Sequence, residues 1–388
     1  MPPPDLQSLT PPALRARRTL KWARYPAHVL PMWVAEMDYP TAEPVQEALG
    51  EAVRRQTFGY PSPEAIAELA QTTAHWLGAA YRWQVDAGAV HVLGDVMQGV
   101  RLAIEAFGSP GDAVVVPSPV YMPFFDVVRI AGRRDVSVPM AWDGRRWTFD
   151  VEGIDRALGA GARIVVLCSP HNPLGRVFDR VELLALAEVV QRHGARVVSD
   201  EIHGPLAFGA AHTPYAALSP QTAAHTVTVL SASKAWNLPG LRCAQVVTGD
   251  PAIAQLWERI PFWSTVGVST MGIEASIAAY RDGGAWLAAV NSTLARNAAL
   301  VARAIDAMPG VRTVPNQGTY LQWLDFTDLG LDVEPAAWLL EQAGVALSPG
   351  PPFGSAAHRF ARLNYATTDA VLADGLERID RAVRRRLG

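Results

Sequence analysis

Short runs of β-branched and aliphatic residues alternate with longer amphipathic stretches over about residues 40–285. This alternation is typical of a mostly parallel sheet with helices on both faces, because parallel neighbours must be joined by a crossover connection. We therefore predict an α/β fold with a seven-stranded, mostly parallel sheet. Its expected strands are residues 89–93, 112–117, 135–140, 163–168, 195–200, 226–230 and 243–249.

The pattern changes after residue 285, where a long helical stretch ends at Pro309 and Gly310. We expect a smaller α+β lobe to follow it. The predicted domains are an N-terminal segment over 1–40 that packs with the small domain and the active site, a large domain over 41–285, and a small domain over 286–388. In the last of these we expect strands at 311–315, 318–326, 344–350 and 358–366 and helices at 333–344 and 367–387.

Charge and cysteine content indicate which partners and which cellular compartment the chain is suited to. The 34 Lys and Arg residues nearly balance the 37 Asp and Glu residues, so no strong field gathers nucleic acid or an anionic membrane. No run reaches the roughly 18 apolar residues of a membrane span, and the N-terminus lacks the apolar core of a signal peptide. Two cysteines in apolar runs suit a reducing compartment. We expect a cytoplasmic protein without nucleic-acid or membrane partners.

Small or polar residues directly follow five of the expected strands. In an open parallel sheet, ligands bind beyond the carboxyl ends of the strands, so these residues should meet at one edge. Lys234 draws particular notice because it is one of only two lysines in the chain, the other being Lys21. The residues at the five strand ends are Gly94 with Asp95, Tyr121, Asn172, Asp200 and Lys234.

Such a set meets the requirements of pyridoxal 5′-phosphate (PLP), which needs an amine for its aldehyde, a carboxylate on its ring nitrogen and a stacking ring. Lys234, Asp200 and Tyr121 supply these three groups. Hydroxyls, a guanidinium and free N–H groups at a helix start would bind the phosphate. The candidates for the phosphate are Ser231, Ser233, Arg242, and the backbone at Gly94, Asp95 and Val96.

Four ordered motifs resemble the class I/II aminotransferase superfamily of fold type I PLP-dependent enzymes. They are Ser-Pro-His-Asn-Pro-Leu-Gly-Arg-Val at 169–177, Ser-Asp-Glu-Ile-His at 199–203, Ser-Ala-Ser-Lys-Ala-Trp-Asn-Leu-Pro-Gly-Leu-Arg at 231–242, and Ala-Arg-Leu-Asn-Tyr at 361–365. Three further motifs resemble one branch of that superfamily, the cystathionine β-lyase or cysteine-S-conjugate β-lyase (MalY/PatB) branch. They are Leu-Pro-Met-Trp-Val-Ala-Glu-Met-Asp-Tyr at 30–39, Phe-Gly-Tyr at 58–60, and Asp-Glu-Ile-His.

The resemblance implies roles for individual residues. It places Asn172 and His203 near the phenolic oxygen of the cofactor and makes Arg362 the clamp for the substrate α-carboxylate. It also implies that Tyr60 reaches the phosphate of a neighbouring subunit, which requires a homodimer with shared active sites. Trp33 is expected to line the substrate channel.

The implied reaction is an α,β-elimination of L-cystathionine or another L-cysteine S-conjugate to a thiol, pyruvate and ammonia. One alternative is an aminotransferase for a non-acidic amino acid, since residues 261–270 carry no arginine for a second carboxylate. A more distant alternative is a non-catalytic regulatory or binding protein on the same fold.

Other residues have structural explanations. We expect Asp95 to cap a helix, and His171, Cys168 and Cys243 to be packing residues. Asp200, Glu201 and His203 should point apart on an extended chain, so we predict no metal site there. Trp22 and Trp263 are expected in the core or the pocket, and Lys21 is expected to tolerate replacement by Arg.

Overall fold

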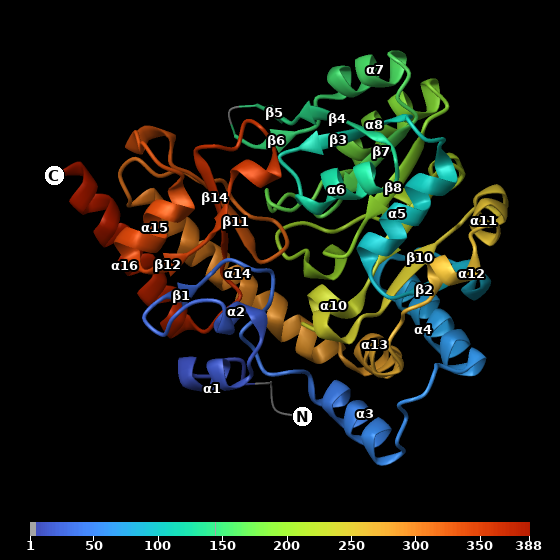
Figure 1. The fold of residues 1–388 in the computed structure, drawn as a ribbon, viewed down its shortest axis with the longest axis horizontal. Helices are drawn as coiled ribbons and strands as arrows, with labels where there is room; N and C mark the ends of the chain where they lie inside the picture. Colours follow the sequence, from blue (N-terminus) through green and yellow to red (C-terminus); the bar gives the residue numbers. More distant parts are fainter. Residues whose placement is uncertain (1–4, 144) are drawn as a thin grey trace.

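The computed structural model describes residues 5–143 and 145–388 of the chain. A seven-stranded sheet forms its centre, in the order β2-β10-β9-β8-β7-β3-β4 (Figure 1). Six of its strands run in the same direction and β10 runs in the opposite direction, which confirms the predicted mostly parallel α/β fold. The strands are β2 (Val90–Leu93), β3 (Ala113–Ser118), β4 (Arg134–Pro139), β7 (Ile164–Cys168), β8 (Arg196–Asp200), β9 (Thr226–Leu230) and β10 (Ala244–Val247).

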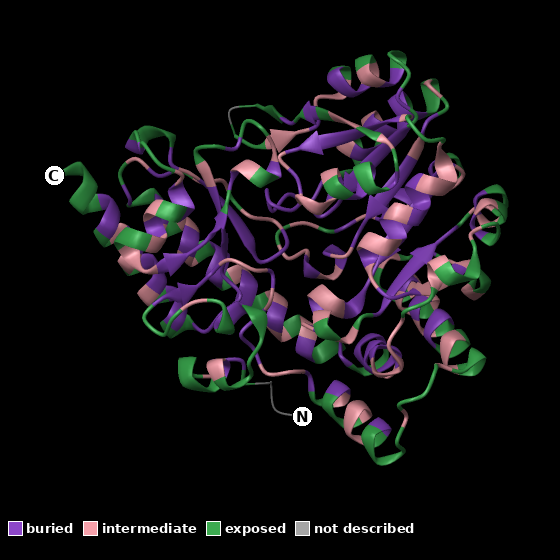
Figure 2. Cartoon of the chain, viewed as in Figure 1, coloured by how far each residue is buried: buried purple, intermediate pink, exposed green. Residues whose placement is uncertain are grey.

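Helices cover both faces of this sheet, and the strands alternate their side chains between them. Val114 packs into the cluster that contains residues of α5 and α6, whereas Val115 packs into the cluster of α7 and α8. Every residue of β3, β7 and β9 is buried, as Figure 2 shows for the middle of the sheet. This two-sided burial explains why the central strands are continuous apolar runs.

The helices of the first part of the chain are α1 (Pro11–Ala16), α2 (Leu20–Ala23), α3 (Glu43–Arg54), α4 (Pro63–Tyr81), α5 (Val96–Phe107), α6 (Pro123–Ile130), α7 (Val151–Gly159), α8 (Arg180–Arg192), α9 (Pro220–Ala223), α10 (Ala232–Ala235), α11 (Pro251–Glu258), α12 (Phe262–Thr265) and α13 (Thr270–Asp282). A short hairpin of β5 (Ala141–Trp142) and β6 (Trp147–Thr148) follows β4. None of the helices in the described residues is long and apolar enough to cross a membrane.

The C-terminal part contains a three-stranded antiparallel sheet in the order β11-β14-β13. The expected strand at 344–350 is divided in two, because its first half pairs with β1 and its second half with β14. The elements are α14 (Gly284–Asp306), β11 (Leu321–Asp325), α15 (Pro335–Ala343), β12 (Val345–Ala346), β13 (Ser348–Pro349), β14 (Phe360–Asn364) and α16 (Asp369–Leu387).

The prediction of a strand at 311–315 is wrong. This stretch forms only an isolated bridge between Arg312 and Asp325. Its carbonyl at Val314 accepts a hydrogen bond from the side chain of Gln322 at 2.7 Å, and Pro315 has no N–H to donate. The stretch therefore cannot continue a backbone ladder beyond the bridge.

The N-terminal segment packs against this C-terminal part. Strand β1 (Leu30–Pro31) pairs in parallel with β12, and Trp22 packs with Leu14, Leu30 and Val371 in a separate apolar cluster. The division of the chain at residues 40 and 285 stays a prediction.

Candidate functional site

A cavity of about 550 Å³ lies at the carboxyl ends of the parallel strands. Its volume is in the range of pockets that hold a cofactor and a small substrate. All the predicted site residues except Tyr60 line it: Trp33, Gly94, Asp95, Val96, Tyr121, Asn172, Asp200, His203, Ser231, Ser233, Lys234, Arg242 and Arg362.

Lys234 lies in α10, directly after β9, and its amine donates a hydrogen bond to the carbonyl of Ala35 at 3.0 Å. Burial, together with the positive charge of Arg362, lowers the pKa of Lys234 to about 8. A lysine with this pKa has a substantial neutral fraction near neutral pH. It can therefore act as a nucleophile toward an aldehyde and as a base.

Asp200 is the last residue of β8 and is only 3% exposed. Its Oδ1 accepts a hydrogen bond from the N–H of Ile202 at 3.0 Å. Burial, together with the negative charge of Glu201, raises the pKa of Asp200 to about 7. Within residues 5–143 and 145–388, no basic side chain forms an ion pair with this carboxylate. A protonated ring nitrogen would supply the missing positive partner, so Asp200 fits the PLP ring.

Arg362 is buried on β14 and is fixed by several partners. Its guanidinium donates to Oδ1 of Asn172 at 2.9 Å, to Oγ of Ser348 at 3.0 Å and to the carbonyl of Trp33 at 3.1 Å. Among the described residues its Nε has no hydrogen-bond partner. A buried guanidinium that faces a cavity with an unused donor is suited to bind a carboxylate.

Tyr121 and His203 lie on the cavity wall, Tyr121 three residues beyond β3 and His203 three residues beyond β8. Burial raises the pKa of the Tyr121 phenol. Burial, together with the charges of Lys234 and Arg362, holds the pKa of His203 well below its usual value, so this ring is neutral. Its Nδ1 has no partner within the described part of the chain and can hydrogen-bond a ligand.

The predicted phosphate end lies at the start of α5. Asp95 caps this helix, as expected, with Oδ1 accepting from the N–H of Gln98 at 2.8 Å. Its second oxygen pairs with Arg242 at 2.6 Å. Ser231 donates its hydroxyl to the carbonyl of Cys243 at 2.6 Å and caps α10. Arg242 and Ser231 therefore already have protein partners with which a phosphate would compete.

Two exposed aromatic residues lie outside the cavity. The side chain of Tyr60 is fully exposed on the loop between α3 and α4. Trp263 is 82% exposed, so the expectation that it lies in the core or the pocket is wrong. Thr270, near Trp263 in sequence, donates to the carbonyl of Gly59 at 2.7 Å and links these two surface regions.

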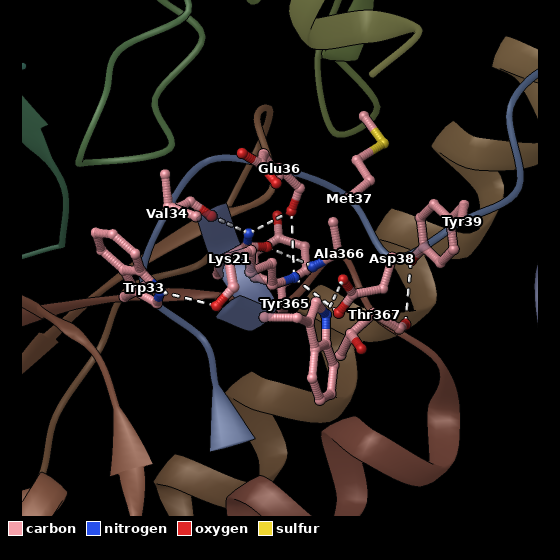
Figure 3. Close-up of polar contacts among 12 residues, drawn as sticks. Lys21, Trp33, Val34, Glu36, Met37, Asp38, Tyr39, Tyr365, Ala366 and Thr367 are labelled. Carbon is pink, nitrogen blue, oxygen red and sulfur yellow. Dashed lines mark hydrogen bonds and ion pairs between the residues drawn. The ribbon is translucent and has the colours of Figure 1, made fainter. Parts of the chain in front are cut away.

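Lys21 is also not as expected. It is 1% exposed and its amine pairs with Asp38 at 2.7 Å (Figure 3). The prediction that Lys21 tolerates Arg assumed an exposed position, and this burial argues against it, because a guanidinium is bulkier than an ammonium. Trp22 beside it is buried, in agreement with the prediction.

Residues predicted to be structural behave mostly as expected. His171 is buried against Phe178, and burial lowers its pKa to about 3. Glu201 accepts hydrogen bonds from Ser199 and His212 rather than facing the cavity. Cys168 and Cys243 are buried but also line the cavity.

Sequence reasoning missed three groups that touch the site residues. These are the carbonyl of Ala35, the hydroxyl of Tyr320 and the hydroxyl of Ser348. All three come from the N-terminal segment or the antiparallel lobe, whereas the sequence pattern points only to residues at the ends of parallel strands. The usable signal for Ser348 was a hydroxyl residue after the apolar run Val-Ala-Leu at 345–347.

Comparisons with known proteins agree over most of the chain. The family model "Aminotransferase class I and II" matches residues 27–379. Cystathionine beta-lyase of Corynebacterium glutamicum is 36% identical over 366 residues, which cover 94% of this chain and 97% of the relative. Cystathionine beta-lyase PatB of Bacillus subtilis is 34% identical, with 91% and 92% covered. A crystal structure of a proposed PLP-dependent β-cystathionase of Corynebacterium diphtheriae superposes with a TM-score of 0.93 at 36% identity, covering 98% and 99% of the two chains.

Proposed function

Because this chain belongs to the aminotransferase class I and II family, we propose that it is a PLP-dependent carbon–sulfur β-lyase. It is an enzyme that eliminates a thiol from L-cystathionine or another L-cysteine S-conjugate and yields pyruvate and ammonia. The observation that carries this function is a single cavity lined by Lys234, Asp200 and Arg362 in a chain whose relatives are named cystathionine β-lyases. The branch that the motifs predicted agrees with these names.

The residues of the cavity fit PLP, and we assign each a part in holding it. Lys234 would bond the aldehyde, Asp200 would face the ring nitrogen and Tyr121 would stack on the ring. Asn172 and His203 would face the phenolic oxygen. The phosphate would be held by Ser231, Ser233, Arg242 and the N–H groups of Gly94, Asp95 and Val96.

When bound, PLP supplies an electron sink for the electron pair left at the substrate Cα. Arg362 holds the α-carboxylate, and the free Lys234 amine removes the proton from Cα. The electron pair at Cα then forms the Cα=Cβ double bond as the Cβ–S bond breaks. The sulfur leaves with the Cβ–S bonding pair, and the Lys234 ammonium protonates it to a thiol. Hydrolysis of the released 2-aminoacrylate gives pyruvate and ammonia. The neutral fraction of Lys234 that its lowered pKa provides suits this step.

We also propose that two copies of the chain share their active sites. Exposed aromatic side chains on the loop between α3 and α4 and on helix α12 support a contact with a second copy, because isolated chains rarely expose such groups together. Tyr60 from one subunit would then reach the phosphate of the other, and light scattering tests the dimer directly. The aromatic residues concerned are Phe58, Tyr60, Phe262 and Trp263, which are 68%, 102%, 69% and 82% exposed.

Both cysteines are free and buried, which supports a reducing, cytoplasmic setting.

The function is tested with purified protein that shows cofactor absorbance. With L-cystathionine we expect equal amounts of pyruvate and thiol, and a loss of about 10²–10⁴-fold in kcat in Lys234→Ala. Undiminished pyruvate release from this variant would contradict the role of Lys234. Conversion of the cofactor to its amine form, with turnover only when a 2-oxo acid is added, would identify an aminotransferase instead. A protein that takes up no cofactor would support a binding role.

A further inference from the structure

The carbonyl of Ala35 lies between two side chains of the candidate site. Lys234 and Tyr320 both donate hydrogen bonds to it, each at 3.0 Å. This carbonyl is thus the protein group that orients the Lys234 amine. A shift of Ala35 would move the amine with it.

The carbonyl of Trp33, two residues earlier, likewise accepts two hydrogen bonds, at the end of the cavity where Arg362 lies. Arg362 donates to it at 3.1 Å and Ser348 donates to it at 2.7 Å. The irregular stretch over residues 33–38, here named the site strap, therefore contacts both Lys234 and Arg362 through its backbone.

Lys21 contacts the site strap at both of its ends, through its side chain at residues 36–38 and through its backbone at Trp33 (Figure 3). The amine of Lys21 donates to the carbonyl of Glu36 at 3.2 Å and pairs with Oδ2 of Asp38 at 2.7 Å. The carbonyl of Lys21 accepts from Nε1 of Trp33 at 3.3 Å. Ala35, which binds Lys234, lies between these anchored positions.

A buried ion pair is by itself weak evidence for stability, because removing two charges from water costs much of what their attraction provides. The Lys21–Asp38 pair is nevertheless nearly closed to solvent, with exposed side-chain fractions of 1% and 2%. Trp22 completes the acceptor site by donating to Oδ1 of Asp38 at 2.7 Å. A pair of this kind is better explained by a fixed geometry than by a gain in stability.

We propose that Lys21 is a positioning residue for the β-elimination. Through its amine, which binds Glu36 and Asp38, it fixes the site strap, and the strap in turn fixes the Lys234 amine and the Arg362 guanidinium. This inference rests on the proposed function for its kinetic consequence. Its structural consequence, an ordered site strap, holds for any reaction at this site.

The test uses the neutral pair Lys21→Met with Asp38→Asn. Removing Lys21 alone would leave an unpaired buried carboxylate and could unfold the chain, whereas the double variant keeps both side-chain lengths and an oxygen for Trp22. We expect the double variant to melt cooperatively and to bind PLP. Hydrogen exchange at the amides of residues 33–38 should be about 10-fold faster in the cofactor-free protein. The kcat/KM for L-cystathionine should fall about 10²-fold, as expected for a small misplacement of reacting groups.

Trp22→Phe is the matched control, because it removes one donor to the same carboxylate and leaves every Lys21 contact in place. It should keep wild-type exchange in the site strap and wild-type kcat/KM. Unchanged exchange and kcat/KM in the double variant would overturn the proposal, as would equal losses in the double variant and the control. If the wild type eliminates no thiol, the proposed function fails, and the exchange measurement still decides the role of Lys21.

Discussion

Replacing Asp200 by Asn should stabilise the cofactor-free protein, by an amount that depends on pH. Burial raises the pKa of Asp200 to about 7 from its ordinary value of 3.8. Each pKa unit between the folded and unfolded states is worth about 1.4 kcal/mol, so the difference corresponds to about 4 kcal/mol. The Asn amide retains an oxygen for the N–H of Ile202 and carries no charge that must be desolvated.

The sign follows from which state holds the proton more tightly. Because the pKa of Asp200 is raised on folding, its contribution to stability is fully present below pH 3.8. It is lost as the pH rises to about 7 and stays lost above that pH. The free energy of unfolding of the Asn variant should therefore exceed that of the wild type by an amount that grows from pH 4 to pH 7 and then levels off.

Urea unfolding of both proteins at half-unit pH steps, with cofactor removed, measures this difference. Glu47→Gln, on the exposed side of α3, controls for the loss of one surface charge. Adding PLP should stabilise the wild type more than the Asn variant, because the ring nitrogen gives the buried carboxylate a positive partner. A difference between wild type and variant that stays constant from pH 4 to pH 8, or equal stabilisation of both by PLP, would refute the reasoning.

Three further predictions concern single residues. Arg362→Lys should raise KM for the amino acid about 10-fold or more with PLP binding retained, measured by steady-state kinetics and cofactor absorbance, because an ammonium cannot grip a carboxylate with two parallel bonds. Asp95→Asn keeps the helix cap but releases Arg242 for the phosphate, so the Kd for PLP should fall by about fivefold or less in a fluorescence titration; a weaker affinity would show that the carboxylate itself supports the site. Lys21→Arg should lower the melting temperature measured by calorimetry, since overpacking a closed core site costs about 1–3 kcal/mol.

The sequence predicts the central sheet well because burial on both faces leaves an unmistakable signal. Strands β7 and β8, for example, were expected within one residue of their observed bounds. The site followed from the same signal, since parallel strands end at a common edge, where Asp200 ends β8 and Lys234 follows β9. Prediction failed where the determining contact is distant in sequence. Val314 has strand character, yet its carbonyl is taken by a side chain from β11.

Lys21 shows a second kind of failure. Lys21 lies near the N-terminus among Arg and Trp residues, and a local sequence of this kind is typical of the protein surface. Its burial depends on Asp38, 17 residues later, and on the pairing of β1 with β12 near the other end of the chain. A local pattern carries no information about such a partner, so the structure was needed to find it.

The contacts within the cavity indicate which residue contributes most to cofactor affinity. At the phosphate end, Arg242 and Ser231 each have a protein partner, in Asp95 and Cys243, so binding exchanges one hydrogen bond for another. Exchanges of this kind have a small net effect, about 0.5–1.5 kcal/mol each. Asp200 differs, because no basic side chain among the described residues forms an ion pair with its buried carboxylate. The protonated ring nitrogen of PLP would form such a pair. The attraction between the two charges would offset the cost of burying the ionised carboxylate, and this offset would contribute to the binding free energy. Affinity for PLP should therefore depend more steeply on Asp200 than on any residue at the phosphate end.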